Sequence, residues 1–326
     1  MQVGGCPDPG DTGAVTTDEE RELTMPFVPD LPAILGPMRR GRADPAFTTD
    51  ADGWWWRSAL TPCGPVTQAL HSRSGTVLSR CWGPGASWQQ EHLPELLGAR
   101  DVLPPGLEAR IDEAVPRRPG TPPPSRSLRG WRTPRAGNVW DNAVAAVLEQ
   151  RVTGKEAKTT WWRLLRDYGT PAPGPAPKGL TTPPSPQTVR LIPSWWWRRQ
   201  GVDRKRSDTI MRLSRIPHVL DRLRHVDSTE ARRIFTAVPG VADWTYAEVA
   251  QRALGDSDAV SVGDYHLSGQ VVFAFTGSWN GTDDQMLELL APFAGHRYRV
   301  VRAVAVAGAA KPRRGPRMTV PQHIYG

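Results

Sequence analysis

The sequence predicts a mainly α-helical protein in which a small α+β module precedes an all-helical domain. Two patterns predict this order. Short runs with strand character cluster between residues 54 and 82, and apolar residues recur at helical spacing from residue 139 onward. A Pro- and Arg-rich stretch at 112–137 separates the two patterns and is typical of a connector.

The composition narrows the class of partner. The chain has 326 residues, a formal net charge of +8 and a sequence pI near 9.8, with arginine supplying nearly all of the positive charge. A basic balance indicates a polyanionic partner, either nucleic acid or an anionic membrane surface. Arginine binds phosphates through paired hydrogen bonds and stacks on rings, which favours nucleic acid over the membrane.

The cysteine spacing and the absence of long apolar runs indicate the compartment and argue against a metal site. The three cysteines, Cys6, Cys63 and Cys81, have no metal-ligand spacing. No apolar run approaches the roughly 20 residues that a membrane span requires, and the N-terminus has no charged-then-apolar signal pattern. We therefore expect a cytoplasmic, nucleoid-associated monomer without a metal site and without a membrane partner.

The N-terminal third predicts an extension followed by the small module. Residues 1–45 are rich in Pro, Gly and Asp, and we expect either disorder or sequence upstream of the true start. Residues 46–111 form the α+β module. Its expected elements are strands at Trp54–Leu60, Val66–His71 and Thr76–Trp82, a turn at 72–75, and a helix at Trp88–Leu97 interrupted by Pro94.

The all-helical domain is predicted over residues 138–310, followed by a basic tail at 311–326. One apolar face runs from Val139 to Leu148, and another runs from Ala157 to Tyr168. Further helices are expected at 203–214, 228–236, 245–254, 265–276, 283–293 and 297–308.

A helical hairpin is predicted around Pro239-Gly240. One apolar helix stops at Val238, and a second begins near Thr245, with Asp243 or Thr245 as its N-cap. The second helix would present free backbone N–H groups, which suit a phosphate. Periodicity alone favours a structural hairpin inside an all-helical domain, because such hairpins are common.

The context of this hairpin resembles the helix-hairpin-helix glycosylases, specifically the DNA-3-methyladenine glycosylase II family. The resemblance rests on Pro239-Gly240, on Trp244-Thr245 and on a loop that ends in Asp264-Tyr265. The segments 148–154 and 295–299 also match. The resemblance covers about 129–305, and the module at 50–100 matches more weakly. Two positions depart from the family pattern. Ala242 stands where the hairpin usually has glycine, and Arg198 stands where relatives often carry histidine.

The resemblance implies a monofunctional DNA glycosylase that flips alkylated purines, such as 3-methyladenine, out of duplex DNA and hydrolyses their bond to the sugar. Asp264 would be the catalytic carboxylate, although the same residue could simply cap the helix beginning at Tyr265. Related glycosylase/lyases carry a lysine where this chain has Trp244, so no Schiff base is expected. Two alternatives stay open: a catalytically inactive DNA-binding protein and a bifunctional glycosylase/lyase.

The resemblance also assigns the remaining candidate residues, which fall into three groups. The DNA-binding hairpin comprises Pro239, Gly240, Val241, Ala242, Trp244 and Thr245. Gln150 and Arg151 would form the wedge that replaces the flipped base, or Arg151 could be a solvated helix-end residue. Trp244, Tyr265 and His296 would line the base pocket. The runs Trp54–Trp56 and Trp195–Trp197 are either substrate contacts or core residues.

The expected partner is double-stranded DNA with damaged bases. No cofactor is expected. An iron–sulfur cluster is excluded by the absence of cysteine after Cys81, and at most a monovalent cation would bind the hairpin carbonyls.

Overall fold

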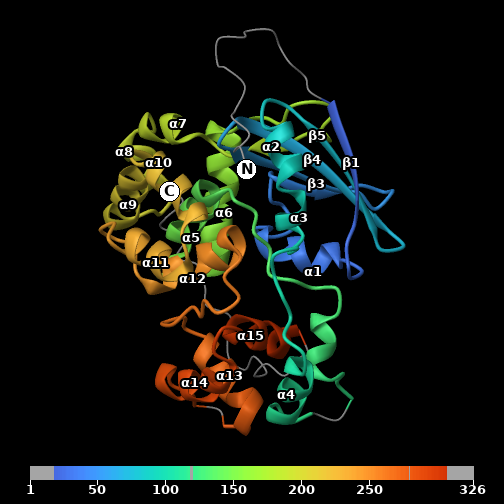
Figure 1. Cartoon of the computed structure of the whole chain (residues 1–326). Helices are drawn as coiled ribbons and strands as arrows, with labels where there is room; N and C mark the ends of the chain where they lie inside the picture. The colour runs from blue at the N-terminus through green and yellow to red at the C-terminus, as the bar shows by residue number, and fades with distance from the viewer. Residues whose placement is uncertain (1–17, 118–119, 279, 307–326) are drawn as a thin grey trace.

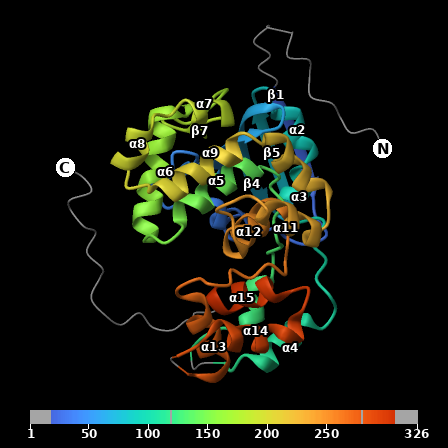
Figure 2. The same cartoon turned by 90° about the vertical axis from the view of Figure 1, so that its left-hand side faces the viewer.

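The computed structural model describes residues 18–117, 120–278 and 280–306. These residues form two lobes (Figure 1). The first lobe contains the large antiparallel sheet and the helices α1–α3 and α5–α12. The second lobe contains α4, α13, α14 and α15, and the chain crosses between the lobes more than once (Figure 2).

The sheet of the first lobe has five antiparallel strands in the order β1-β5-β4-β3-β2. Its strands are β1 Asp18–Thr24, β2 Phe47–Thr49, β3 Trp55–Thr61, β4 Gly64–Arg73 and β5 Thr76–Trp82. The three predicted strands are confirmed as β3, β4 and β5. Ser74 and Gly75 both have positive φ and form the two-residue turn that joins β4 to β5, the geometry that a tight hairpin of this twist requires.

The prediction of disorder over residues 1–45 is wrong for the described part, residues 18–45. Strand β1 pairs with β5 along its whole length, and the segment continues into α1 Leu31–Leu35 and the 3₁₀ turn η1 Gly36–Met38. The charged sequence of β1 hides the strand, because an edge strand exposed on alternate positions needs backbone pairing rather than apolar alternation. Residues 1–17 lie outside the described residues.

The predicted limits of the module and the connector also need correction. Two short helices, α2 Ala86–Glu91 and α3 Leu93–Leu96, end the module, and Pro94 lies just after the break between them. The next helix, α4 Leu107–Ala114, packs on the 3₁₀ turn η2 Pro124–Leu128, and η2 packs on α15 in the second lobe. The described part of this stretch, residues 112–117 and 120–137, is therefore not a simple linker, since Leu128 and Trp131 are buried in the core.

The helical part of the first lobe surrounds α5 Val139–Glu149, which is buried at every residue from Val139 to Leu148. The other helices are α6 Gly154–Tyr168, α7 Pro186–Arg190, α8 Ser194–Arg199, α9 Arg204–Ser214, α10 Pro217–Arg222, η3 Leu223–His225, α11 Ser228–Thr236 and α12 Asp243–Val249, which continues as a π-helical turn, Ala250–Leu254. A two-stranded sheet, β6 Thr170–Pro171 and β7 Thr181–Thr182, follows α6.

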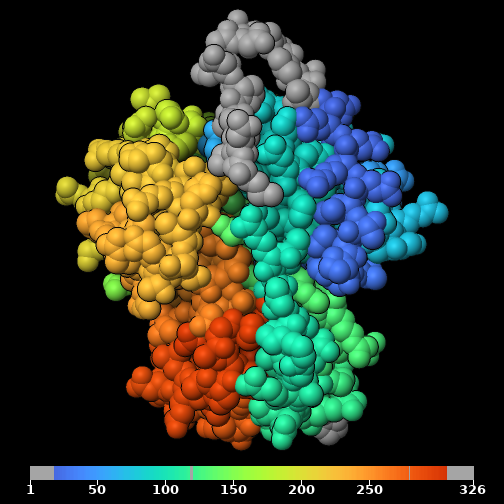
Figure 3. All heavy atoms as spheres, viewed as in Figure 1, coloured from blue at the N-terminus to red at the C-terminus, as the bar shows by residue number. Residues whose placement is uncertain are grey.

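The second lobe is completed by α13 Leu267–Thr276, α14 Asp283–Leu290, η5 Ala291–Phe293 and α15 Arg297–Val306. All six helices predicted beyond residue 200 are confirmed within a few residues of their predicted ends. Figure 3 shows that this lobe joins the C-terminal helices to the much earlier segment around α4. The predicted tail at 311–326 lies outside the described residues.

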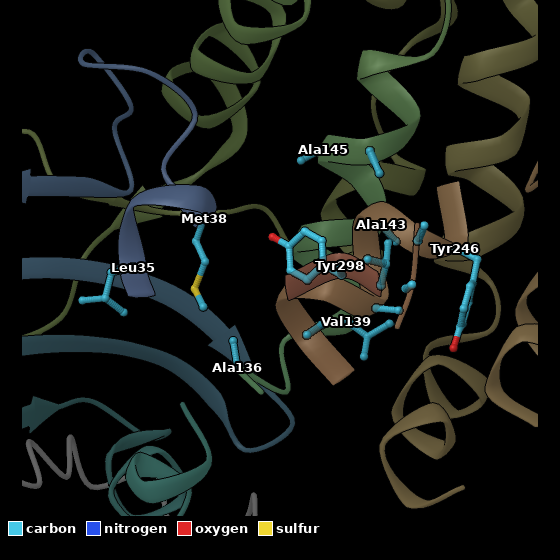
Figure 4. Packing of buried hydrophobic residues seen from close by; sticks show 14 of the residues in the cluster. Leu35, Met38, Ala136, Val139, Ala143, Ala145, Tyr246 and Tyr298 are labelled. Atoms are coloured by element: carbon cyan, nitrogen blue, oxygen red, sulfur yellow. The ribbon is translucent and has the colours of Figure 1, made fainter. Parts of the chain in front are cut away.

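One hydrophobic core joins the two lobes. Figure 4 shows where they meet: Met38 of η1, Val139 and Ala143 of α5, and Tyr298 of α15 lie close to one another. The candidate carboxylate Asp264 lies close to this junction along the chain. It is part of the loop that follows α12 and crosses from the first lobe to the second.

Candidate functional site

The predicted hairpin is present between α11 and α12. Thr236 ends the first helix, Asp243 begins the second, and the N–H of Val241 donates to the carbonyl of Val238 at 2.9 Å to close the turn. Gly240 has a φ of +96°, and a Cβ atom there would lie 1.9 Å from the hydroxyl of Thr209 on α9. Only glycine satisfies both constraints.

Ala242, the departure of the hairpin from the family pattern, is under no backbone strain. Its φ of −117° and ψ of 179° are extended values that any residue adopts, and its side chain is exposed. The left-handed position of this turn is Gly240, two residues earlier. The alanine therefore fits the hairpin as it stands, and its effect on the approach of a phosphate stays a prediction.

Gln150 joins the end of α5 to the hairpin. Its side-chain amide donates to the carbonyl of Gly240 at 3.0 Å and to the hydroxyl of Thr245 at 2.8 Å. Arg151 follows at the tip of the turn between α5 and α6, exposed to solvent and with a left-handed φ of +55°. The two wedge candidates thus differ: the amide of Gln150 is held against the protein, and Arg151 projects.

The carbonyl groups of the hairpin already have partners within the protein. Pro239 accepts from Arg212 at 3.3 Å, Gly240 accepts from Gln150, and Val238 accepts within the turn. A carbonyl oxygen can accept twice, so the monovalent cation expected here stays a prediction.

An exposed ion pair sets the charge at the start of α12. Arg232 of α11 donates from Nε and Nη2 to the carboxylate of Asp243 at 2.8 and 2.7 Å. Hydrogen bonding to Arg232 holds the pKa of Asp243 below its ordinary value. This pairing offsets the negative charge that Asp243 brings to the helix end, where an anion such as phosphate would be favoured.

Asp264 makes two kinds of contact. Its Oδ1 accepts from the backbone N–H groups of His266 and Leu267 at 2.8 and 3.0 Å, as a cap does, and α13 begins at Leu267. Its Oδ2 accepts only a long bond, 3.4 Å, from the indole N–H of Trp244. One oxygen is therefore used to fix the side chain, and the other is only weakly engaged.

The loop that carries Asp264 is tied to three helices. From α12, the hydroxyl of Tyr246 donates to Asp256 at 3.1 Å, and Gln251 donates to Ala259 and Ser261. From the second lobe, Arg297 of α15 pairs with Asp258 and Asp283 of α14 accepts from the N–H of Gly263 at 2.9 Å. Asp256 and Asp258 thus serve the loop, and the position of Asp264 is set from both lobes.

A buried ion pair that the sequence analysis missed lies beneath this loop. Glu248 accepts from the hydroxyl of Ser261 at 2.6 Å and from Arg252 at 2.9 Å. Burial raises the pKa of Glu248, but the guanidinium of Arg252 and the other partners outweigh it, so that the pKa lies below its ordinary value. The signal in the sequence was the spacing, because Trp244, Glu248 and Arg252 follow one another at four-residue intervals on a single helix face.

The three base-pocket candidates are not brought together by any contact within the described residues. Trp244 is half-buried against Asp264, whereas Tyr265 is 92% exposed and packs edge-on against His266. The imidazole Nδ1 of His296 accepts from Nε of Arg299 at 3.2 Å. Desolvation and the charge of Arg299 lower the pKa of His296, so its ring is neutral at pH 7.

The two tryptophan runs are mostly structural. Trp196 and Trp197 are buried, and Trp196 donates to Asp167, whereas Trp195 is 55% exposed on α8. In the other run, Trp56 stacks on Trp82 and donates to Asp50 at 2.7 Å. None of these side chains contacts Asp264 or the hairpin within the described residues.

A cavity of about 310 Å³ is bordered by the end of α3, the segment around Thr133, the start of α11 and the residues Leu254 and Gly255, where the loop of Asp264 begins. None of the predicted site residues lines it. Among the residues that the structure describes, no group of three or more His, Cys, Asp or Glu side chains is arranged to hold a metal ion. No helix of the described chain is long and apolar enough to cross a membrane.

Comparison with solved structures decides the fold. The 3-methyladenine DNA-glycosylase from Archaeoglobus fulgidus matches with a TM-score of 0.70 at 15% sequence identity, over 88% of this chain and 98% of that one. The apo form of the 8-oxoguanine glycosylase/lyase from Clostridium acetobutylicum matches with a TM-score of 0.62 at 9% identity, over 89% and 98%. This chain has the helix-hairpin-helix DNA glycosylase fold. The predicted fold class is confirmed, and the resemblance to the helix-hairpin-helix glycosylases is confirmed at the level of the fold.

Sequence comparison finds relatives over about half of the chain. Two curated proteins, from two strains of Mycobacterium tuberculosis, are each described as a probable bifunctional transcriptional activator/DNA repair enzyme AlkA. Each is 32% identical to this chain over 164 residues, which is 48% of this chain. The chain spans about a third, 32%, of the length of these curated relatives. No model of a known protein family matches the chain.

Proposed function

We propose that this protein is a monofunctional DNA glycosylase that excises alkylated purines, such as 3-methyladenine, from duplex DNA. The observation that carries the proposal is the state of Asp264. Its Oδ1 is fixed by two backbone N–H groups, and its Oδ2 is held only by the long bond from Trp244. A fixed carboxylate with a free face is what a reaction that develops positive charge requires.

The chemistry follows from that charge. A stacked base hides the bond between C1′ and the base nitrogen, so the nucleotide must first leave the helix, at a cost of a few kcal/mol. When the bond breaks, the electron pair leaves with the base and C1′ acquires oxocarbenium character. The carboxylate of Asp264 stabilises that charge while water adds to C1′, and the proton of the water passes to solvent or to the departing base.

The hydrolytic outcome is proposed from Trp244. A lyase reaction needs an amine to form a Schiff base with the sugar, and an indole cannot form one. Among the described residues, no hydrogen bond or ion pair joins the lysines at 155, 158, 178 and 205 to Asp264 or Trp244. An alkylated purine suits a site with one carboxylate because it already carries positive charge and leaves easily.

Duplex DNA is the proposed partner. A structural neighbour, the Clostridium glycosylase/lyase, is described in complex with double-stranded DNA containing cytosine opposite 8-oxoG. The net charge of +8 and the projecting Arg151 beside the hairpin fit a phosphate-rich duplex. The rival interpretation is a protein that binds DNA through the same hairpin but does not catalyse base release.

Base release from alkylated duplex DNA tests the proposal. Purified protein is incubated with methylated duplex, and the free bases are identified by mass spectrometry. We expect methylated purines to be released and the strand to stay intact until alkali is added. DNA binding without release would favour the inactive protein, and a covalent adduct trapped by borohydride would favour the lyase.

A further inference from the structure

The segment from Gly36 to Asp44, which we call the bridging segment, has an unexpected place in the structure. Its sequence reads as part of a disordered extension, yet Arg40 and Asp44 are 5% and 4% exposed. Asp44 holds the backbone of the segment by accepting from the N–H groups of Arg40 and Ala46 at 2.6 and 3.1 Å. It also accepts from the indole of Trp161 on α6 at 3.0 Å, so the segment is fixed to the first lobe.

Arg40 connects the bridging segment to the wedge turn. Its guanidinium donates to Glu149 at 3.0 Å and to Asn142 at 3.5 Å, both on α5. Glu149 is the last residue of α5, and it immediately precedes Gln150, whose amide binds the hairpin, and the projecting Arg151. The end of α5 is therefore held on one side by Arg40 and on the other by the hairpin.

Pro37 connects the same segment to the loop of Asp264. Its carbonyl accepts from Nε of Arg252 at 2.9 Å, and Arg252 pairs with Glu248. Glu248 accepts from Ser261, and the carbonyl of Ser261 accepts from the N–H of Asp264 at 3.2 Å. A continuous chain of hydrogen bonds thus runs from the bridging segment to the candidate catalytic carboxylate.

The connection through Arg40 and the connection through Pro37 are coupled by the charges of their side chains. Arg40 lowers the pKa of Glu248, and Glu149 raises the pKa of Arg252, so the four charges act on one another across the junction. A buried ion pair is weak evidence for stability, because apolar residues of similar volume often stabilise a fold as well or better. The pair of Arg40 and Glu149, whose side chains are 6% and 22% exposed, is therefore not explained by stability alone.

We propose that Arg40 is a positioning residue for base extrusion, which keeps the wedge turn in register with the loop of Asp264. This inference rests on the proposed function. When Arg151 enters the duplex, steric contact with the DNA tends to displace the end of α5. The fixed Arg40–Glu149 pair resists that displacement, so the energy of binding goes into unstacking the base rather than into moving the turn.

Extrusion can be measured without catalysis, by the fluorescence of 2-aminopurine placed next to the lesion. Stopped-flow traces are recorded for the full-length protein and for Arg40→Met, Arg40→Lys and Glu149→Gln, on two duplexes. In one duplex the lesion faces a normal base, and in the other it faces an abasic-site analogue. Arg80→Met is the control, because Arg80 of β5 pairs with Glu20 of β1 on the exposed surface of the five-stranded sheet.

Arg40→Met and Glu149→Gln should each slow extrusion of the paired lesion by about tenfold, and the double variant should be no slower than either. The loss should be under about threefold opposite the abasic analogue, where little unstacking energy is needed. Arg40→Lys should recover most of the rate, and Arg80→Met should keep it. Equal losses on both duplexes, no recovery with lysine, or an equal loss in Arg80→Met would overturn the inference.

The same measurements distinguish failure of the proposed glycosylase function from failure of the proposed role of Arg40. A wild-type protein that gives neither a fluorescence rise nor base release would end the proposed function, and the role of Arg40 with it. If the wild type extrudes but releases no base, only the catalytic proposal fails, and the fluorescence comparison still decides the role of Arg40. Thermal melting of each variant ensures that the rates are compared at a temperature where all are folded.

Discussion

Asp264 combines a structural and a chemical role in one side chain. The oxygen that accepts from His266 and Leu267 positions the start of α13, and the other oxygen lies beside Trp244. Because an amide has the same shape and its oxygen can still accept both N–H groups, the two roles can be separated by one substitution.

Asp264→Asn should abolish base release, by at least about a hundredfold, because it removes the charge that stabilises the transition state. DNA binding and the melting temperature should change little, since the cap is kept. Single-turnover release and a binding titration check this. The control is Asp283→Asn, which alters a carboxylate that contacts the same loop through Gly263. Near-normal turnover in Asp264→Asn would make this residue purely structural.

The hairpin offers a matched pair of glycine and alanine changes. Gly240→Ala should lower the free energy of unfolding by about 2–3 kcal/mol, because it combines a left-handed backbone with a clash against Thr209. Ala242→Gly should change it by no more than about 0.5 kcal/mol, because the backbone is extended and exposed there. Urea denaturation of both variants measures the difference. Comparable effects at the two positions would show that the turn is assigned incorrectly.

At the scale of elements, the turn between α5 and α6 is the most constrained connection near the site. Thr153 and Glu156 form a reciprocal cap that starts α6, with bonds of 3.3 and 2.9 Å. Glu149 ends α5, so four residues reverse the chain, and Arg151 takes the left-handed conformation. An arginine there costs roughly 1–2 kcal/mol relative to an ordinary backbone, which glycine would avoid.

Arg151→Gly should therefore separate stability from function. Glycine relieves the backbone strain, which stabilises the folded protein, but it also gives the unfolded chain more freedom, which destabilises it. Because these two effects nearly cancel, we expect the free energy of unfolding to stay within about 1 kcal/mol of the wild type. Release of a paired lesion should still fall by about tenfold or more, because the wedge side chain is gone, and it should fall less for a mismatched lesion. Single-turnover rates on the two substrates, measured beside Arg151→Ala, test this. Equal losses on both would exclude the wedge.

At the scale of the whole molecule, the sheet and the helical part of the first lobe are joined through buried charges. Asp141 of α5 accepts from the N–H of Leu60 on β3 at 3.1 Å, and Arg57 of the same strand is also buried. Desolvation by burial raises the pKa of Asp141 to about 6 and lowers the pKa of Arg57 to about 10. Their mutual attraction therefore does not compensate for burial in either group.

This arrangement predicts how stability depends on pH. The folded protein holds the Asp141 proton more tightly than the unfolded chain does, because the pKa rises from 3.8 to about 6 on folding. The stabilising effect of that proton is complete only well below pH 3.8 and is lost as the pH rises through 6. From pH 4 to pH 7, Asp141 should therefore lower the free energy of unfolding by about 2 kcal/mol.

Asp141→Asn removes that titration. Any change in the free energy of unfolding that comes from altered hydrogen bonds is the same at every pH. Relative to the wild type, the free energy of unfolding of the variant should gain about 2 kcal/mol between pH 4 and pH 7. Urea denaturation of both proteins at half-unit intervals measures the gain. Two curves that run parallel across this range would show that Asp141 is ionised throughout.

The sequence by itself determined the elements whose signals are local. The apolar face beginning at Val139, the helices near 204–214 and 228–236, and the Pro239-Gly240 turn each depend on spacing within a few residues. The glycosylase resemblance added Asp264, and the structure shows that this residue also has the capping contacts expected from its place before an apolar run. Periodicity and turn chemistry are encoded over one or two turns of chain, so such features survive without tertiary context.

Only the tertiary structure decided which distant residues meet. Arg40 pairs with Glu149 across 109 residues, Gln150 reaches Gly240 across 90, and Arg252 reaches Pro37 across 215. The segment 18–45 and the described residues of the stretch 112–137 looked unstructured because their order comes from pairing and burial against other parts of the chain. No local pattern specifies such contacts, since a charged or proline-rich segment becomes ordered only when the packed core supplies its partners.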